Sequence, residues 1–384
     1  MAHHSTVFSQ LLKWLPRHEF ESLAREHHWG AALRKTSRWS QFVAMGMGQL
    51  SGRMSLRDVV ANAAAQARQW YHLGARPVKR TTLARVNEQQ PASLYEALFG
   101  RLYGRCQGKA PGHGFRFKNF LYSLDSSLID LSLQLFPWSR YALSKGAVKL
   151  HVELDHRGHL PAFARITDSH TADLEVARTL QLPAGSIVVF DKGYGDYSWY
   201  KSLTQAKIYF VTRLKKNARY RVIERRAVLA RKGVICDQRI KLTGSKSRRE
   251  SLPELRRVVY RDPETKKRYE FLTNHFDLAA ATIAAIYKQR WQIELFFKWI
   301  KQNLKIKAFL GTSLNAVKTQ LWIALCLYLL LAYLKFLSKI AASLQQMLRL
   351  LQLNLFAKRD LIALLKGDPP PLEPVPSNYR LAFA

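Results

Sequence analysis

Five short runs rich in apolar, β-branched and aromatic residues follow one another between residues 120 and 212, and a candidate helix precedes each of the last two. Runs of this kind are typical of strands buried in a sheet. Three strands, a helix, a strand, a helix and a further strand predict an α/β fold with a mixed sheet. The expected strands are Phe120–Leu131, Val148–Leu154, Ala162–Ile166, Ile187–Phe190 and Ile208–Thr212, and the expected helices are Thr171–Leu180 and Tyr197–Ala206.

The chain changes character on both sides of this region. Residues 1–115 are expected to be helical, because apolar residues such as Phe8, Leu11 and Phe42 recur at helical spacing and Ser55 is a plausible N-cap. We therefore divide the chain into a helical domain, an α/β domain with an inserted β-rich segment, and a helical C-terminal segment with a Pro-rich tail. The predicted ranges are 1–115, 119–345 interrupted by 215–277, and 346–384, with further helices over 278–304 and 313–366.

Charge is the first indication of function. The chain has 61 Lys and Arg against 27 Asp and Glu, a net charge of +34, and 18 basic against 4 acidic residues lie between Lys201 and Arg257. With 48% hydrophobic residues the chain folds, which excludes a disordered basic tail. An excess of this size indicates a phosphate-bearing partner, either nucleic acid or lipid. A basic structural or ribosome-associated protein is the alternative.

Two features bear on the compartment. The three cysteines are isolated, without the spacing of a disulfide framework or zinc site, and the first residues lack the apolar core of a signal peptide, which predicts a cytoplasmic protein. The apolar run Leu321–Leu334 has 14 residues, whereas a membrane span needs about 20. We therefore expect a buried core helix here and no membrane partner.

The helix that follows the basic insertion carries most of the chemical information. Tyr287, Arg290, Glu294 and Lys301 form the pattern Y-x2-R-x3-E-x6-K, and at about 100° per residue they lie within a stripe of roughly 60°. A carboxylate thus lies between cations and a phenol on one edge of the helix. We expect Glu294 to bind a metal ion and Arg290 and Lys301 to hold phosphate oxygens. Ordinary i,i+4 pairing, as between Glu294 and Lys298, is the alternative.

Two aspartates in the strand-like runs are the candidate partners of Glu294. Asp125 lies inside the first run among apolar neighbours, and a buried carboxylate is costly unless it is paired or binds a cation. Asp191 directly follows the run Ile187–Phe190, at the end of a buried strand where α/β sheets carry functional groups. A turn or cap role is the alternative for Asp191. The competing acidic residues are Asp130, Asp155, Asp168 and Asp173.

Together Asp125, Asp191 and Glu294 fit two-metal phosphoryl transfer. In that chemistry carboxylates from separate elements hold two ions about 3.5–4 Å apart, one activating water or a 3′-hydroxyl and the other stabilising the leaving oxygen. Hard oxygen ligands without cysteine favour Mg²⁺, with Mn²⁺ as a substitute, over zinc. The sequence therefore predicts an enzyme whose cofactor is two Mg²⁺ ions.

A group of histidines is a second candidate for catalysis. Four histidines, His151, His156, His159 and His170, form the main rival catalytic group, although scattered surface or turn histidines are the favoured explanation, and His156 to His159 are expected to form a hairpin turn. No G-x-S-x-G or Walker A pattern supports a serine hydrolase or P-loop ATPase.

A basic turn in the helical region is a candidate DNA contact. It contains Lys79 and Arg80 and leads into a helix with Leu83, Arg85 and Asn87. The turn and helix fit either the recognition element of a helix-turn-helix or an ordinary solvated helix.

The four-residue helix pattern resembles the signature of the insertion-sequence-four family of bacterial DDE transposases, and all four residues are present at the expected spacing. In that family the first Asp lies on the opening strand of a ribonuclease H-like fold, as Asp125 does here, and the second lies in a D-K-G-Y-like segment, as in Asp191–Tyr194. A β-rich domain is inserted between the second Asp and the Glu, and the separation of 103 positions between Asp191 and Glu294 accommodates one. The resemblance covers about residues 119–345 and extends less specifically to the helical leader.

This resemblance implies a ribonuclease H-like core, a β-rich insertion and an N-terminal helical domain that binds DNA ends. It implies cut-and-paste transposition, with the terminal inverted repeats and target DNA as partners and a homodimer in the paired-end complex. Some members form hairpin ends with a base-flipping aromatic residue, which here would be Tyr or Phe because Trp is absent between Lys201 and Ala285. The carboxylates would hold the metals, and Tyr287, Arg290 and Lys301 the DNA backbone. Further DNA contacts are expected from Lys298, Lys192, Lys79 and Arg80.

Two other functions remain open at this stage. A different ribonuclease H-like nuclease, such as a junction resolvase, would use the same carboxylates but leaves the basic insertion unexplained. A catalytically inactive DNA-binding relative is disfavoured by the three intact carboxylates. Inverted repeats flanking the gene would distinguish a transposase from both.

Overall fold

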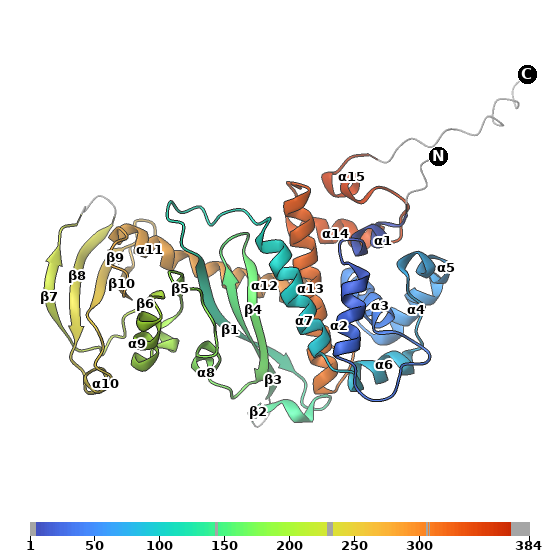
Figure 1. Cartoon of the computed structure of the whole chain (residues 1–384), viewed down its shortest axis with the longest axis horizontal. Helices are drawn as coiled ribbons and strands as arrows, with labels where there is room; N and C mark the ends of the chain where they lie inside the picture. The colour runs from blue at the N-terminus through green and yellow to red at the C-terminus, as the bar shows by residue number, and fades with distance from the viewer. Residues whose placement is uncertain (1–4, 143–144, 229–232, 305, 307, 370–384) are drawn as a thin grey trace, which may run out of the picture.

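The computed structural model describes residues 5–369 except 143–144, 229–232, 305 and 307. The predicted α/β fold is confirmed: a helical region lies at one end of the molecule, a long twisted sheet extends to the other, and a long apolar helix runs between them (Figure 1). The helical region comprises α1 (Val7–Leu12), α2 (Arg17–Glu26), α3 (Arg38–Leu50), α4 (Leu56–Ala65), α5 (Ala67–Trp70), the 3-10 turn η1 (Tyr71–Leu73), α6 (Arg80–Gln89) and α7 (Ser93–Gln107).

Serine caps and apolar spacing account for these helices. Ser37 accepts a hydrogen bond from the Ser40 N–H at the start of α3, and Ser55 accepts one from the Asp58 N–H at the start of α4, as predicted. Phe8 and Phe42, which set the apolar spacing, are fully buried. The local pattern of the sequence therefore suffices to place this region.

Each of the five predicted runs forms a strand of the central sheet. Three parallel strands lie at its centre, because β1 pairs in parallel with β5, and β5 pairs in parallel with β6. Their C-terminal ends therefore share one edge of the sheet. The elements are β1 (Leu121–Leu131), the 3-10 turn η2 (Pro137–Ser139), β2 (Arg140–Ala142), β3 (Lys145–Asp155), β4 (Leu160–Asp168), α8 (Asp173–Ala177), β5 (Ile187–Val189), the 3-10 turn η3 (Lys192–Tyr194), α9 (Tyr197–Gln205) and β6 (Tyr209–Arg213).

The β-rich insertion continues this sheet instead of forming one of its own. Its strand β10 pairs antiparallel with β6, so that the described sheet has ten strands in the order β2-β3-β1-β5-β6-β10-β9-β8-β7, with β4 beside β3. Strand β7 was not predicted, because charged residues interrupt the few apolar residues of its sequence, YRVIERR. The insertion comprises β7 (Tyr220–Arg226), β8 (Val234–Leu242), α10 (Ser245–Arg249), β9 (Leu255–Arg261) and β10 (Arg268–Thr273).

The prediction of one uninterrupted helix over 278–304 is wrong. Two helices, α11 (Ala280–Gln289) and α12 (Trp291–Asn303), meet at Arg290. The Arg290 N–H bonds to the Tyr287 carbonyl three residues back, at 3.1 Å, which tightens the turn at the junction. The predicted stripe is therefore divided between two helices, with Arg290 between them.

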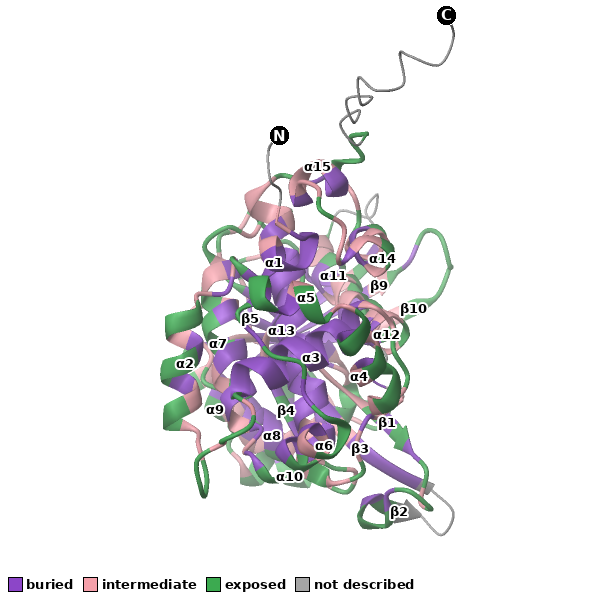
Figure 2. Cartoon of the chain, turned by 90° about the vertical axis from the view of Figure 1, so that its right-hand side faces the viewer, coloured by how far each residue is buried: buried purple, intermediate pink, exposed green. Residues whose placement is uncertain are grey.

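The long helix α13 (Leu314–Leu337) connects the two ends of the molecule. Its composition and length suit a membrane span, yet 78% of its most apolar window is buried inside the protein, as expected for a core helix. One hydrophobic core joins α1–α7, α12, α13, strands β1, β3 and β4, and the last helices, and Figure 2 shows α3 and α13 as mostly buried ribbons in the middle of the molecule. The chain ends with α14 (Leu344–Asn354) and α15 (Leu361–Lys366).

Candidate active site

The two predicted aspartates lie on neighbouring parallel strands. Asp125 is in the middle of β1, opposite Val152 of β3, and Asp191 follows β5 directly and starts the turn η3. Both carboxylates are half-buried. Because β1 and β5 run in parallel, the sheet presents both side chains near its C-terminal edge.

Tyr287 of α11 contacts one of these carboxylates. Its ring packs against Phe271 of β10, with 4.9 Å between the ring centroids, and its hydroxyl donates to Asp191 Oδ1 at 3.2 Å. Burial raises the pKa of the Tyr287 phenol to about 12, so that the phenol remains a donor at neutral pH. The helix pair thus reaches the Asp191 segment through a protonated phenol.

Arg290, at the junction of α11 and α12, contacts the other two carboxylates. Its Nη1 donates to Asp125 Oδ2 at 3.2 Å, and its Nη2 donates to Glu294 Oε1 at 2.5 Å. Two neighbouring side chains, Tyr287 and Arg290, therefore contact all three predicted carboxylates. In this arrangement no three His, Cys, Asp or Glu side chains among the described residues are grouped closely enough to hold a metal ion.

The carboxylates nevertheless fit a divalent cation. Burial raises the pKa of Asp125 to about 6, although the Ser126 N–H and the Arg290 guanidinium both favour its ionised form. A desolvated carboxylate of this kind is stabilised by further positive charge. Three carboxylates from separate elements provide the hard oxygen ligands that Mg²⁺ and Mn²⁺ prefer. Asp125, Asp191 and Glu294 are therefore the candidate ligands of a divalent ion.

Asp173, one of the competing acidic residues, contacts Ser126, the neighbour of Asp125 on β1. Ser126, whose N–H donates to Asp125 Oδ1 at 2.9 Å, turns its hydroxyl to Asp173 Oδ1 at 2.8 Å. Asp173 also lies 3.4 Å from Lys149 Nζ. No local motif marks Asp173, because its place beside β1 depends on how α8 packs on the sheet.

The remaining cations of the predicted site differ in their surroundings. Lys301 donates to Ser127 Oγ at 2.7 Å and to the Leu128 carbonyl at 2.8 Å, so it binds the strand that carries Asp125. Lys298 on α12 and Lys192 on η3 are exposed. These two side chains are therefore available to a ligand that approaches the site.

The rival histidine cluster does not form a catalytic group. His156 is buried and its Nε2 lies 2.7 Å from Ser123 Oγ, and burial lowers its pKa to about 3. His151 is also buried, beside Thr167. As predicted, residues 156–159 form the turn between β3 and β4. The two buried histidines are neutral structural groups.

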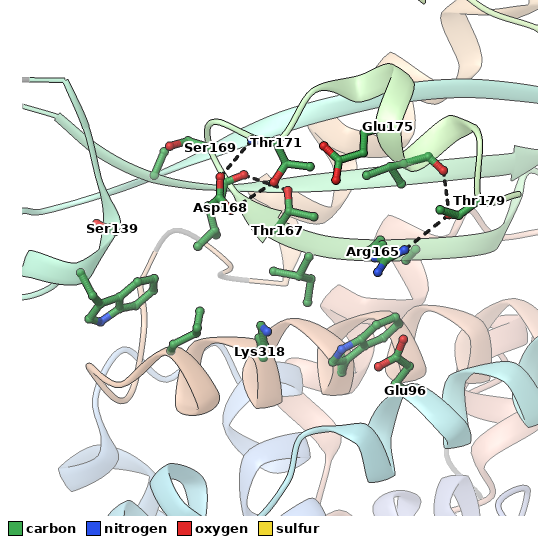
Figure 3. Close-up of a pocket in the computed structure, with 18 of the residues that line it drawn as sticks. Glu96, Ser139, Arg165, Thr167, Asp168, Ser169, Thr171, Glu175, Thr179 and Lys318 are labelled. Atoms are coloured by element: carbon green, nitrogen blue, oxygen red, sulfur yellow. Dashed lines mark hydrogen bonds between the residues drawn. The ribbon is translucent and has the colours of Figure 1, made fainter. Parts of the chain in front are cut away.

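A cavity of about 890 Å³ lies elsewhere, along β4 between α8 and α13 (Figure 3). None of the predicted metal or DNA ligands lines it. Asp168 was one of the acidic residues that competed with Asp125 and Asp191 as a candidate metal ligand. At this cavity it accepts hydrogen bonds from the His170 and Thr171 N–H groups and so caps its own turn. The cavity is separate from the candidate site.

The basic turn of the helical region is only partly as expected. Lys79 and Arg80 are exposed at the start of α6, and Arg85 is exposed on the helix. Leu83 and Asn87 are buried, with Asn87 accepting a hydrogen bond from Gln41 at 2.7 Å, so these two side chains pack inside the helical region and Arg85 is the exposed one.

Comparison with known proteins identifies the catalytic region. Residues 122–330 match a family described as a transposase DDE domain, and residues 3–76 match a domain of unknown function. A putative transposase, y4zB, of Sinorhizobium fredii is 35% identical over 312 residues, which are 79% of this chain and 85% of the relative. A probable transposase for insertion sequence element IS5377 of Geobacillus stearothermophilus is 29% identical over 66% of this chain and 67% of its own length.

A solved structure is also similar in part. The piggyBac transposase in a synaptic complex with hairpin DNA is 12% identical, with a TM-score of 0.46, and the match covers 96% of this chain and 80% of that chain.

Proposed function

The chain belongs to the DDE transposase family, and on this premise we propose that Asp125, Asp191 and Glu294 form its metal-binding active site. It is a DNA transposase, an enzyme that cleaves DNA and transfers the cut strand, and enzymes of this family use divalent metal ions. The observation that carries the proposal is the convergence of all three carboxylates on Tyr287 and Arg290. We propose two Mg²⁺ ions, which Mn²⁺ can replace.

The chain's own residues have distinct tasks in this mechanism. Divalent ions held by the carboxylates would activate the attacking hydroxyl and stabilise the leaving oxygen. Ser126 holds Asp125 in place through its backbone N–H, and Tyr287 orients Asp191 through its phenol. Arg290 provides a planar pair of donors that matches a phosphate near the cleaved bond. Lys301 fixes α12, and with it Glu294, to β1.

The exposed cations of the helical region support a second DNA-binding surface. Between residues 27 and 87 there are ten Lys and Arg residues and a single carboxylate, Asp58. Nine of these cations are exposed, and in the described residues none of the nine forms a salt bridge. Unpaired exposed cations of this density favour binding to phosphates. We propose that Lys79, Arg80 and their neighbours bind the terminal inverted repeats, and that Lys298 and Lys192 contact DNA at the active site.

Several finer assignments follow the same proposal. The four-residue pattern supports membership of the insertion-sequence-four family and cut-and-paste transposition, with target DNA as the second DNA partner. Pairing of two ends requires a homodimer on DNA. The enzyme would act in the cytoplasm, on the nucleoid. Hairpin ends would be detected as snap-back products on a denaturing gel.

Cleavage of a supercoiled plasmid that carries the element's own ends tests the proposal. With Mg²⁺, the wild type should release the fragment between the ends, whereas Asp125→Asn, Asp191→Asn and Glu294→Gln should bind the ends and leave them uncut. Glu175→Gln, an exposed carboxylate outside the site, is the matched control and should cut normally. Cleavage by any of the three site variants at the wild-type rate would exclude that residue from the metal site.

A further inference from the structure

Arg290 occupies the space between two carboxylates that are proposed to share a metal ion. Its guanidinium bonds to Asp125 Oδ2 and to Glu294 Oε1, and only 17% of its side chain is exposed. The ring of Tyr287 lies 5.9 Å from the guanidinium carbon. Its Nε is buried without a hydrogen-bond partner among the described residues. Among the described residues, the hydrogen-bond partners of the guanidinium are thus these two carboxylates.

A guanidinium in this position competes with a metal ion. Asp125 already uses Oδ1 to accept the Ser126 N–H and Oδ2 to accept Arg290. A cation bound by Asp125 and Glu294 would have to share these oxygens with a fixed positive charge only a few ångströms away. Both the lost hydrogen bonds and the repulsion between like charges oppose metal binding while Arg290 stays in place.

The same guanidinium is the group best placed to bind a DNA phosphate. A bidentate bond to phosphate uses the Nη donors that now contact Asp125 and Glu294. Arg290 cannot make both sets of contacts at once. When it turns to a phosphate, both carboxylates lose a competing cation and become free to coordinate metal.

We propose that Arg290 makes metal binding depend on DNA. Without DNA it holds Asp125 and Glu294 as an internal cation and weakens their affinity for divalent ions. A phosphate at the cleavage point draws the guanidinium away and so raises that affinity. By linkage, metal ions must tighten DNA binding by the same factor. The inference rests on the proposed metal site, and it would keep the enzyme from cutting before its substrate is in place.

Mn²⁺ binding measured by the loss of the free-ion EPR signal tests this coupling without any need for catalysis. The titration is done on the full-length protein alone and on its complex with a pre-cut duplex that ends at the element's terminal repeat. The duplex alone corrects for ions bound by the DNA. For the wild type we expect DNA to tighten Mn²⁺ binding about tenfold or more. For Arg290→Gln we expect tight binding without DNA and little further effect of the duplex.

Two matched variants make the outcome specific. Lys358→Gln removes the same charge from an exposed position near α15, outside the proposed DNA contacts, and it should behave like the wild type. Arg290→Lys keeps the charge but loses the paired donors, and it should bind Mn²⁺ with intermediate affinity. Equal Mn²⁺ affinity of the wild type with and without DNA would overturn the coupling, as would an Arg290→Gln protein no tighter than wild type. If Glu294→Gln binds Mn²⁺ as the wild type does on DNA, the metal site itself is wrong.

Discussion

Tyr287 and Asp191 are 96 positions apart in the chain, yet the phenol of one donates to the carboxylate of the other at 3.2 Å. The contact joins the helix pair to the turn after β5, so it links the two segments that carry the second and third carboxylates. It also holds one Asp191 oxygen in a fixed orientation before any ligand binds. The pattern of the helix and the D-K-G-Y segment are therefore parts of one structural unit.

Replacement of Tyr287 by Phe tests the role of this bond. The ring stays packed on Phe271, so we expect the free energy of unfolding to change by about 1 kcal/mol or less, the usual value of one hydrogen bond. Strand cleavage should fall about tenfold because Asp191 loses its orientation. Plasmid cleavage and urea unfolding measure the two effects. A loss of stability of several kcal/mol with unchanged cleavage of the folded fraction would show that the phenol is structural only.

The two cations at the start of α6 should contribute to end binding through phosphate contacts. Each contact with duplex DNA adds about 0.9 to the slope of log K against log salt concentration, so Lys79→Gln with Arg80→Gln should lower the slope by about 1.8. Filter binding at several salt concentrations measures it. The pair Lys358→Gln and Lys366→Gln removes equal charge near α15, far from α6, and should leave the slope unchanged (Figure 1). Equal slopes for the two double variants would remove α6 from the interface.

Glu153 of β3 should make stability depend on pH. It is 7% exposed, and burial raises its pKa to about 8, whereas an unfolded Glu titrates near 4.3. Between these values the native state holds a proton that the unfolded chain releases, so the stability of the wild type falls as pH rises from about 4.3 to about 8. Glu153→Gln should flatten this dependence and be the more stable protein at pH 8.5. Urea unfolding at pH 5.5, 7 and 8.5 measures it, with the exposed Glu175→Gln as control. Parallel curves for wild type and Glu153→Gln would refute the assignment.

A buried ion pair should hold the insertion to α11. Arg256 bonds to both oxygens of Asp237, at 2.7 and 2.8 Å, and to the Leu278 carbonyl just before α11. Because Arg256→Ala leaves a buried carboxylate unpaired, we expect a loss of about 3–5 kcal/mol in unfolding free energy. Arg268→Ala, in an exposed pair with Glu270, should cost about 0–1 kcal/mol. Chemical denaturation separates the two values, and similar losses would contradict the buried role.

The elements of the site could be predicted, whereas their contacts could not. The β-branched run before Asp191 and the helical spacing of Glu294 and Lys301 are local patterns, and they placed the carboxylates on the correct elements. The bonds from Arg290 to Asp125 and from Ser126 to Asp173 join residues far apart in sequence, so they depend on the order of strands and the packing of helices. The break between α11 and α12 at Arg290 could not be predicted either, because neither helix contains a Gly or Pro. The extension of the central sheet by β10 depends on its pairing with β6, which no local sequence pattern predicts.

The burial of α13 has a consequence for the evolution of such proteins. This helix follows Glu294 in the chain, yet its apolar surface is covered by α7, α6 and α3 from the region before the sheet. A fragment that lacks the first hundred or so residues would leave that surface exposed and would aggregate. Recombination between related elements could therefore exchange these two regions only when both inherit matching surfaces.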